Sequence, residues 1–124
     1  MNIIRAWLPV AVYMAIIFVL SAQSYLPTPL IFGGHDKLEH FLIYLGLALL
    51  AFRGAVISPL MWRSGPYFQS LCLAALYGAS DEYHQRFVPG RTADALDWLA
   101  DVLGAAVGLV IVSIVRKRFT KGGR

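Results

Sequence analysis

Four apolar stretches, each close to the length of a membrane-spanning helix, make up most of this chain. They cover approximately residues 6–22, 38–56, 66–82 and 94–115. A helix needs roughly 20 mostly apolar residues to cross a bilayer, and it satisfies its backbone polar groups within its own segment. Only 15% of the residues are charged, whereas soluble domains contain about 25%. The sequence therefore predicts a single all-α domain over residues 1–124, folded as a four-helix transmembrane bundle.

The segments between these stretches are rich in turn-forming residues, as expected for loops. Residues 23–34 contain two prolines and two glycines, and residues 88–91 contain a Pro-Gly pair. Asp36 stands where the N-cap of the second helix is expected, and the fourth helix is expected to begin near Thr92.

Lysine and arginine are distributed unevenly between the two sides of a four-span arrangement. Eight of the 11 fall on the side that holds both termini, at positions 5, 53, 63, 116, 117, 118, 121 and 124. The other side holds Lys37, Arg86 and Arg91. Because cytoplasmic loops carry an excess of these residues, both termini are expected in the cytoplasm, and the acidic motifs are expected to face outward. The basic C-terminus is interpreted as a membrane anchor, and no nucleic-acid partner is expected.

Two ionisable residues are expected below the membrane surface. Twelve uncharged residues separate His40 from Arg53, and fourteen separate Asp101 from Arg116. Both segments fall short of the roughly 20 residues needed to cross, so His40 and Asp101 are expected on the order of 8 Å deep. Ionisable groups at such depth face the bundle interior or a water-filled cleft. Local thinning of the bilayer is the alternative, and it requires no site.

Three aspartates share one face of the fourth helix. Asp94, Asp97 and Asp101 recur at spacings of three and four residues. Gly104 and Gly108 continue the same stripe and would let another helix approach closely. Aligned carboxylates need cations or protons among them. The balancing positive charge could come from a bound metal or from three basic residues, namely Lys37, Arg86 and Arg91.

The second helix carries Lys37, His40 and Tyr44 on one face by the same spacing. A histidine beside carboxylates can transfer protons near neutral pH.

The third helix places Tyr77, Asp81 and Gln85 on one face, while Glu82 and Arg86 have the spacing of an ion pair. Histidines and carboxylates together can bind a divalent cation, but their spacing matches no known metal motif. One cysteine, Cys72, excludes a cysteine-based zinc site. The sequence therefore assigns no metal site and identifies no cofactor.

Two segments resemble the VanZ-like family of small bacterial membrane proteins. They read Asp36-Lys37-x-x-His40-Phe41-x-x-Tyr44 and Glu82-x-x-Gln85-x-Phe87-x-Pro89-Gly90-Arg91-x-x-Asp94-x-x-Asp97. The chain departs from the family at Asp101, where asparagine is more usual, and at Asp81, directly before the family's glutamate. The resemblance implies a multi-pass protein of the bacterial cytoplasmic membrane. It also implies a link to teicoplanin resistance, which is associated with the member that gave the family its name.

Together these features predict an outward-facing polar cleft that binds or modifies the head group of a lipid or of a lipid-linked cell-wall precursor. If the protein is an enzyme, three residues are expected to be catalytic, namely His40, Glu82 and Asp97. Six are expected to bind the ligand, namely Lys37, Tyr44, Gln85, Arg91, Asp94 and Asp101. The expected partners are membrane lipids, and the sequence does not fix an oligomeric state. The alternatives are a non-catalytic structural or interaction protein and a small proton-coupled exporter, which usually has a lone acid in mid-membrane.

Overall fold

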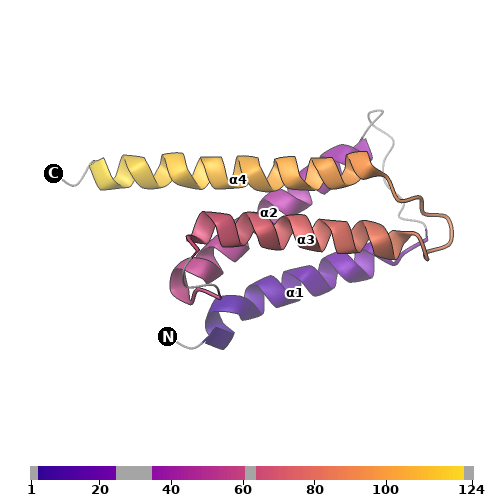
Figure 1. The fold of residues 1–124 in the computed structure, drawn as a ribbon, viewed down its shortest axis with the longest axis horizontal. Helices are drawn as coiled ribbons and strands as arrows, with labels where there is room; N and C mark the ends of the chain where they lie inside the picture. The colour runs from indigo at the N-terminus through magenta and orange to yellow at the C-terminus, as the bar shows by residue number, and fades with distance from the viewer. Residues whose placement is uncertain (1–2, 25–34, 61–63, 122–124) are drawn as a thin grey trace.

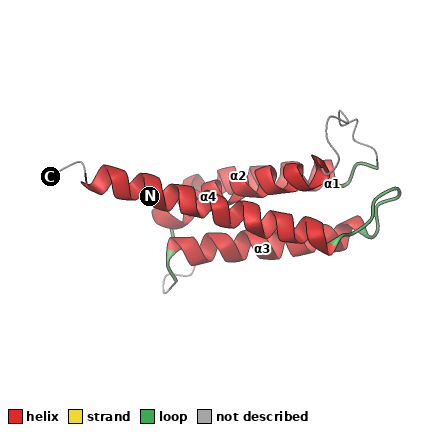
Figure 2. Cartoon of the chain, turned by 90° about the horizontal axis from the view of Figure 1, so that it is seen from above, coloured by secondary structure: helices red, strands yellow, loops and turns green. Residues whose placement is uncertain are grey.

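A computed structural model describes residues 3–24, 35–60 and 64–121. These residues form four α-helices and no strand: α1 (Ile3–Ser21), α2 (His35–Ile57), α3 (Pro66–Gln85) and α4 (Ala95–Lys121). Successive helices run in opposite directions along a shared axis, so both ends of the chain lie at the same end of the bundle (Figure 1). The perpendicular view shows the same alignment (Figure 2). The predicted all-α fold is confirmed.

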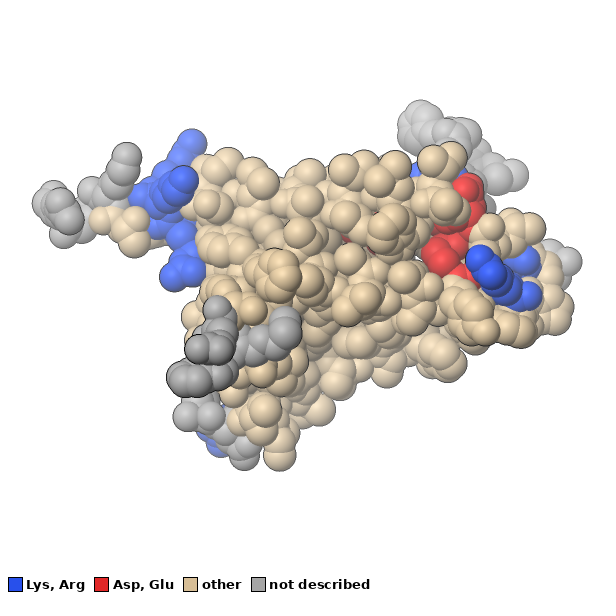
Figure 3. Space-filling model, in the orientation of Figure 1, with Lys and Arg blue, Asp and Glu red and all other residues tan. Residues whose placement is uncertain are grey.

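Three of the helices are long and apolar enough to cross a membrane. They are α1, most of α2 and most of α4. Large apolar side chains on their outer faces are exposed, including Ile16 and Val107. On the face that Figure 3 shows, the described surface between the two charged ends is almost entirely uncharged.

The third helix, α3, has 20 residues but is less apolar than the three helices that could cross a membrane. Its polar side chains are turned inward, since Gln69, Ser70 and Gln85 are all buried. Helix α3 packs against the other three helices. Its predicted membrane span therefore stays a prediction. Helix α3 runs to Gln85, three residues beyond the predicted apolar stretch.

Helices α2 and α4 form the tightest contact in the bundle. A Cβ atom on Gly104 would collide with the backbone carbonyl of Phe41, and one on Gly108 would lie 3.1 Å from the carbonyl oxygen of Leu45. The predicted close approach at these two glycines is confirmed. It brings the beginnings of α2 and α4 together, and these carry Lys37, His40, Asp97 and Asp101.

Two predicted helix starts differ from the structure by one to three residues. Helix α2 begins at His35, so Asp36 lies in its first turn rather than at the N-cap. Helix α4 begins at Ala95 rather than near Thr92. Asp94 caps it, because its Oδ1 accepts a hydrogen bond from the N–H of Leu96 at 2.9 Å.

Candidate functional site

All seven acidic residues lie at one end of the bundle, where α2 begins, α3 ends and α4 begins. We refer to it as the acidic end (Figure 3). Its carboxylates belong to Asp36, Glu39, Asp81, Glu82, Asp94, Asp97 and Asp101. Among the described residues, three lysines or arginines accompany them, namely Lys37, Arg86 and Arg91. Seven carboxylates against three cations leave a formal excess of four negative charges, before histidine is counted.

Lys37 joins the start of α2 to the start of α4. Its Nζ lies 2.9 Å from Oδ1 of Asp97, 3.2 Å from Oδ2 of Asp94 and 3.5 Å from Oδ2 of Asp36. The Lys37 ammonium and the N–H of Leu96 hold the pKa of Asp94 below its ordinary value, because both stabilise the carboxylate. Of the cations considered from sequence, Lys37 is the one that balances the aspartate stripe.

His40 and Asp101 form the deepest polar contact of the acidic end. Nδ1 of His40 lies 2.8 Å from Oδ1 of Asp101, whose side chain has no exposed surface. The other ring nitrogen, Nε2, lies 3.9 Å from Oδ2 of Asp97. Helix α3 makes room for this contact at Gly78, where a Cβ atom would lie 2.7 Å from Oδ2 of Asp101.

Glu82 caps α4 from the neighbouring helix. Its Oε2 accepts a hydrogen bond from the backbone N–H of Asp94 at 2.9 Å. In a capping box this role belongs to a glutamate three residues after the N-cap, but that position is Asp97, which pairs with Lys37. The predicted pair between Glu82 and Arg86 is not formed. Glu82 is buried and turned toward α4, whereas the Arg86 guanidinium lies 5.9 Å from the ring centre of Tyr83.

A cavity of about 150 Å³ opens beside His40, between α1, α2, α3 and the loop before α4. Its polar lining consists of Ser21, Glu39, His40, Tyr44, Asp81, Gln85 and Arg91. Nε2 of Gln85 donates to the hydroxyl of Ser21 at 3.2 Å. Nε of Arg91 donates to the backbone carbonyl of Gln23 at 2.9 Å, which ties the loop to the end of α1. Both charge signs therefore border one space.

A second cavity, of about 320 Å³, lies between α3 and the start of α4. Its lining includes Glu82, Arg86, Asp94 and Trp98. Glu82 borders this cavity, whereas His40 borders the first.

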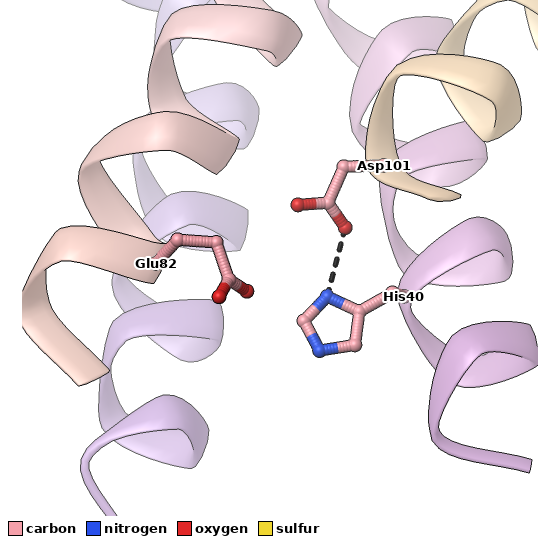
Figure 4. Close-up of side chains that lie close together, drawn as sticks. All are labelled: His40, Glu82 and Asp101. Carbon is pink, nitrogen blue, oxygen red and sulfur yellow. Dashed lines mark hydrogen bonds and ion pairs between the residues drawn. The ribbon is translucent and has the colours of Figure 1, made fainter. Parts of the chain in front are cut away.

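Three side chains from three different helices could hold a metal ion. Ligand atoms of His40, Glu82 and Asp101 all lie within 4.8 Å of one another. Figure 4 shows the two carboxyl groups and the imidazole ring directed into the same space. The sequence did not reveal this group, because its members stand 42 and 19 residues apart and form no local motif.

Comparison with known proteins places the chain in a family. A family model described as VanZ/LLP1 matches residues 6–116, which is most of the chain. The chain belongs to the VanZ/LLP1 family. Among curated proteins and among solved structures, none matches this VanZ/LLP1 chain. Membership and the apolar helices together make it a membrane protein.

The residues singled out in this VanZ/LLP1 chain divide into two adjoining groups. Six belong to the network across α2, α3 and α4, namely Lys37, His40, Glu82, Asp94, Asp97 and Asp101. Three line the first cavity, namely Tyr44, Gln85 and Arg91. Asp81 was not among the residues predicted to act or bind, although it is buried and lines the same cavity. The spacing that places Asp81 on the same helix face as Gln85 could have indicated that it belongs to the site.

Proposed function

We propose that this protein binds the head group of a membrane lipid, or of a lipid-linked cell-wall precursor, in the cavity beside His40. The observation that carries this proposal is a small cavity with both charge signs on a protein whose outer helix faces are apolar. Arg91 would contact a phosphate, since guanidinium groups suit phosphate geometry. Glu39 and Asp81 would contact an amine or sugar hydroxyls.

The size of the cavity suits part of a head group rather than a whole lipid. Its volume of about 150 Å³ corresponds to about five water molecules at about 30 Å³ each. A phosphate or a small amine fits this space, while acyl chains would lie along the apolar outer faces of the helices.

Unpartnered buried groups favour a ligand site over a purely structural cluster. The hydroxyl of Tyr44, Oε1 of Glu82 and Oδ2 of Asp101 are buried without a hydrogen-bond partner. Buried polar groups in native proteins are nearly always bonded. A cluster that served only to lock helices together would be expected to satisfy these three atoms internally.

The distribution of basic residues supports an outward-facing site. Among the described residues outside the acidic end, lysine and arginine lie near the start of α1 and towards the ends of α2 and α4, at the opposite end of the bundle. That end is expected in the cytoplasm, which leaves the acidic end at the outer leaflet of the bacterial cytoplasmic membrane. Teicoplanin acts outside that membrane on cell-wall precursors, so the association known for the family fits this orientation.

A second candidate function is hydrolysis or group transfer on the bound head group. The specific observation is the contact between His40 and Asp101, because a carboxylate on Nδ1 fixes the orientation of an imidazole that acts as acid or base. His40 also borders the cavity. In this reaction Glu82 or Asp97 would assist His40, and Arg91 would stabilise charge on the phosphate.

Native mass spectrometry of the purified full chain tests head-group binding. We expect a phospholipid or a lipid-linked precursor to co-purify with wild type, and its abundance to fall about tenfold in Arg91→Gln. Losing a hydrogen bond to a charged group costs about 1.5–3 kcal/mol, and 1.4 kcal/mol is about tenfold. Asp81→Asn provides a second cavity variant, and Arg53→Gln, at the opposite end, provides a control. The absence of bound lipid, or equal binding by all variants, contradicts the proposal.

Incubation with labelled lipids separates binding from catalysis. Phospholipids and lipid-linked cell-wall precursors would be given to wild type and to His40→Gln. A product formed by wild type and lost in His40→Gln supports the enzyme. Bound but unchanged lipid with both proteins supports a binding protein.

Thiol labelling in intact cells tests the orientation. In a Cys72→Ser background, Thr92→Cys places a thiol in the loop at the acidic end, and Thr120→Cys places one at the opposite end; both positions are exposed. A membrane-impermeant maleimide is expected to label Thr92→Cys in intact cells and Thr120→Cys only after permeabilisation. The reverse pattern contradicts an outward-facing cavity.

A further inference from the structure

Two buried carboxyl groups at the acidic end each leave one oxygen without a partner. Glu82 is 8% exposed and Asp101 is 0% exposed. Glu82 uses Oε2 to cap α4, and Asp101 uses Oδ1 to contact His40. Their other oxygens, Oε1 and Oδ2, are buried without a hydrogen bond. Such atoms are uncommon in native structures, and a bound ion is one of the explanations for them.

The basic residues of the acidic end are engaged elsewhere. Lys37 pairs with Asp94 and Asp97. Arg86 lies over the ring of Tyr83, and Arg91 bonds to backbone carbonyls of residues 20 and 23. No lysine or arginine in the described part of the chain therefore forms an ion pair with Glu82 or Asp101. Unless His40 is protonated, the two carboxylates carry uncompensated negative charge in a buried place, where it is costly.

We propose that His40, Glu82 and Asp101 bind a divalent transition-metal ion, with Zn²⁺ or Mn²⁺ as the best-matched ions. Imidazole nitrogen suits zinc, whereas carboxylate oxygen suits manganese as well. Three protein ligands leave a coordination position open, as in catalytic zinc sites. Ligand atoms on one tetrahedral Zn²⁺ lie about 3.4 Å apart, given bonds of about 2.0–2.2 Å. The present ligand atoms lie within 4.8 Å of one another, so they would have to draw together to bind the ion.

Asp97 is placed to support a metal-bound His40, and two cavities give an ion access to the site. When Nδ1 of His40 binds the ion, Nε2 carries the proton and faces Oδ2 of Asp97, which lies 3.9 Å away. A carboxylate on the second ring nitrogen is the usual support for a metal-bound histidine. His40 opens to one cavity and Glu82 to the other, so an ion can enter from solvent. Tyr44, with its unpartnered hydroxyl, also lines the first cavity.

Equilibrium dialysis of the full chain in detergent tests the site without any lipid, so its result is separate from that of the head-group experiment. The protein would be stripped with a chelator and dialysed against Zn²⁺ or Mn²⁺, and bound metal would be counted by mass spectrometry. We expect one ion per chain. Outer-shell substitutions in metal sites typically cost 10–100-fold in affinity, so Glu82→Gln and Asp101→Asn should each weaken binding at least about tenfold.

The choice of variants keeps the fold intact and the control matched. Glutamine at position 82 retains an oxygen to accept the N–H of Asp94, and asparagine at position 101 retains an oxygen for His40. Asp36→Asn removes one carboxylate of the same end whose side chain is 54% exposed, and it should bind metal as wild type does. Circular dichroism would confirm that each variant is folded.

Two results overturn the proposal. One is wild-type protein that binds neither ion. The other is metal binding that is weakened in Asp36→Asn as much as in Glu82→Gln. That result would mean that the ion is held by the overall negative charge of the acidic end and not by these three ligands. If both ligand variants unfold, Co²⁺ bound to wild type provides the answer. Coordination by histidine and two carboxylates gives the intense visible bands of a four-coordinate ion, whereas the weak spectrum of hydrated Co²⁺ overturns the site.

Discussion

The carboxylate of Asp101 on α4 lies 2.8 Å from Nδ1 of His40 on α2, and it has no exposed surface. Gly78 of α3 lies against the same carboxylate, since a side chain there would collide with it. Three helices therefore meet at one acidic group. Its contact with His40, which lines the first cavity, links the packing of the bundle to the chemistry of that cavity.

Replacing Asp101 by asparagine and by leucine should have clearly different effects on stability. Asparagine keeps an acceptor for the ring N–H and exchanges a charged hydrogen bond for a neutral one, at a cost of about 1 kcal/mol. Leucine leaves His40 without its partner, and losing one partner of a buried pair costs about 3–5 kcal/mol. Denaturant unfolding in detergent measures both values. Equal stabilities for the two variants would show that the contact does not hold α2 to α4.

Lys37 and Asp97 should show a favourable coupling energy in a double-mutant cycle. The variants are Lys37→Met, Asp97→Asn and their combination, with the free energy of unfolding as the readout. Asp97 is buried and loses its cation in Lys37→Met, so the second substitution should partly restore stability. The same cycle with Asp36→Asn is the control, because that contact is longer, at 3.5 Å, and more exposed. Strictly additive effects for Lys37 and Asp97 would contradict a structural ion pair.

Asp94 should contribute to stability in a way that is lost only in acid. Its folded-state pKa lies below the ordinary value of 3.8, because Leu96 and Lys37 stabilise the charged form. A lowered pKa means that the contribution is present above the unfolded pKa and disappears as the pH falls through the folded one. Asp94→Asn should therefore be less stable than wild type by a constant amount between about pH 5 and pH 8, and the difference should shrink below about pH 4. A stability difference between Asp94→Asn and wild type that widens in acid would contradict a lowered pKa for Asp94.

Gly104→Ala should force α2 and α4 apart. The added methyl group would meet the backbone of Phe41, which cannot rotate away, and overpacking of this kind costs about 1–3 kcal/mol. Gly65→Ala is the matched control, because nothing lies within 4 Å of its Cβ position and its φ of −63° suits alanine. We expect that control to lose no more than about 1 kcal/mol, the usual cost of alanine at an N-cap such as Gly65. Similar unfolding midpoints for both variants would contradict the close helix contact.

Periodicity in the sequence was enough to predict the helix faces that meet. The spacing of Asp94, Asp97 and Asp101 placed them on one face, and the structure turns that face toward Lys37 and His40. These predictions succeed because a helix fixes which residues share a face from local spacing alone. The glycines that follow on the same stripe predicted a close helix contact for the same reason, although the spacing did not say which helix would make it.

Contacts that depend on the relative placement of helices were not predictable from spacing. Glu82 had the local spacing of a pair with Arg86, yet it caps a different helix. Arg91 was expected to balance carboxylates, but its guanidinium donates to backbone carbonyls at the end of α1. In each case several local partners were chemically acceptable. The choice among them follows from the packing of α3 against α4 and of the loop against α1.

The account depends most on a head group occupying the cavity between His40 and Arg91. A crystal structure of the full chain, grown in a lipid phase with its native lipids, measures this directly. We predict electron density for a phosphate or an amine in that cavity, within hydrogen-bond distance of Arg91 or Asp81. A cavity that contains only water or an acyl chain, with the acidic side chains turned out into solvent, would contradict the account.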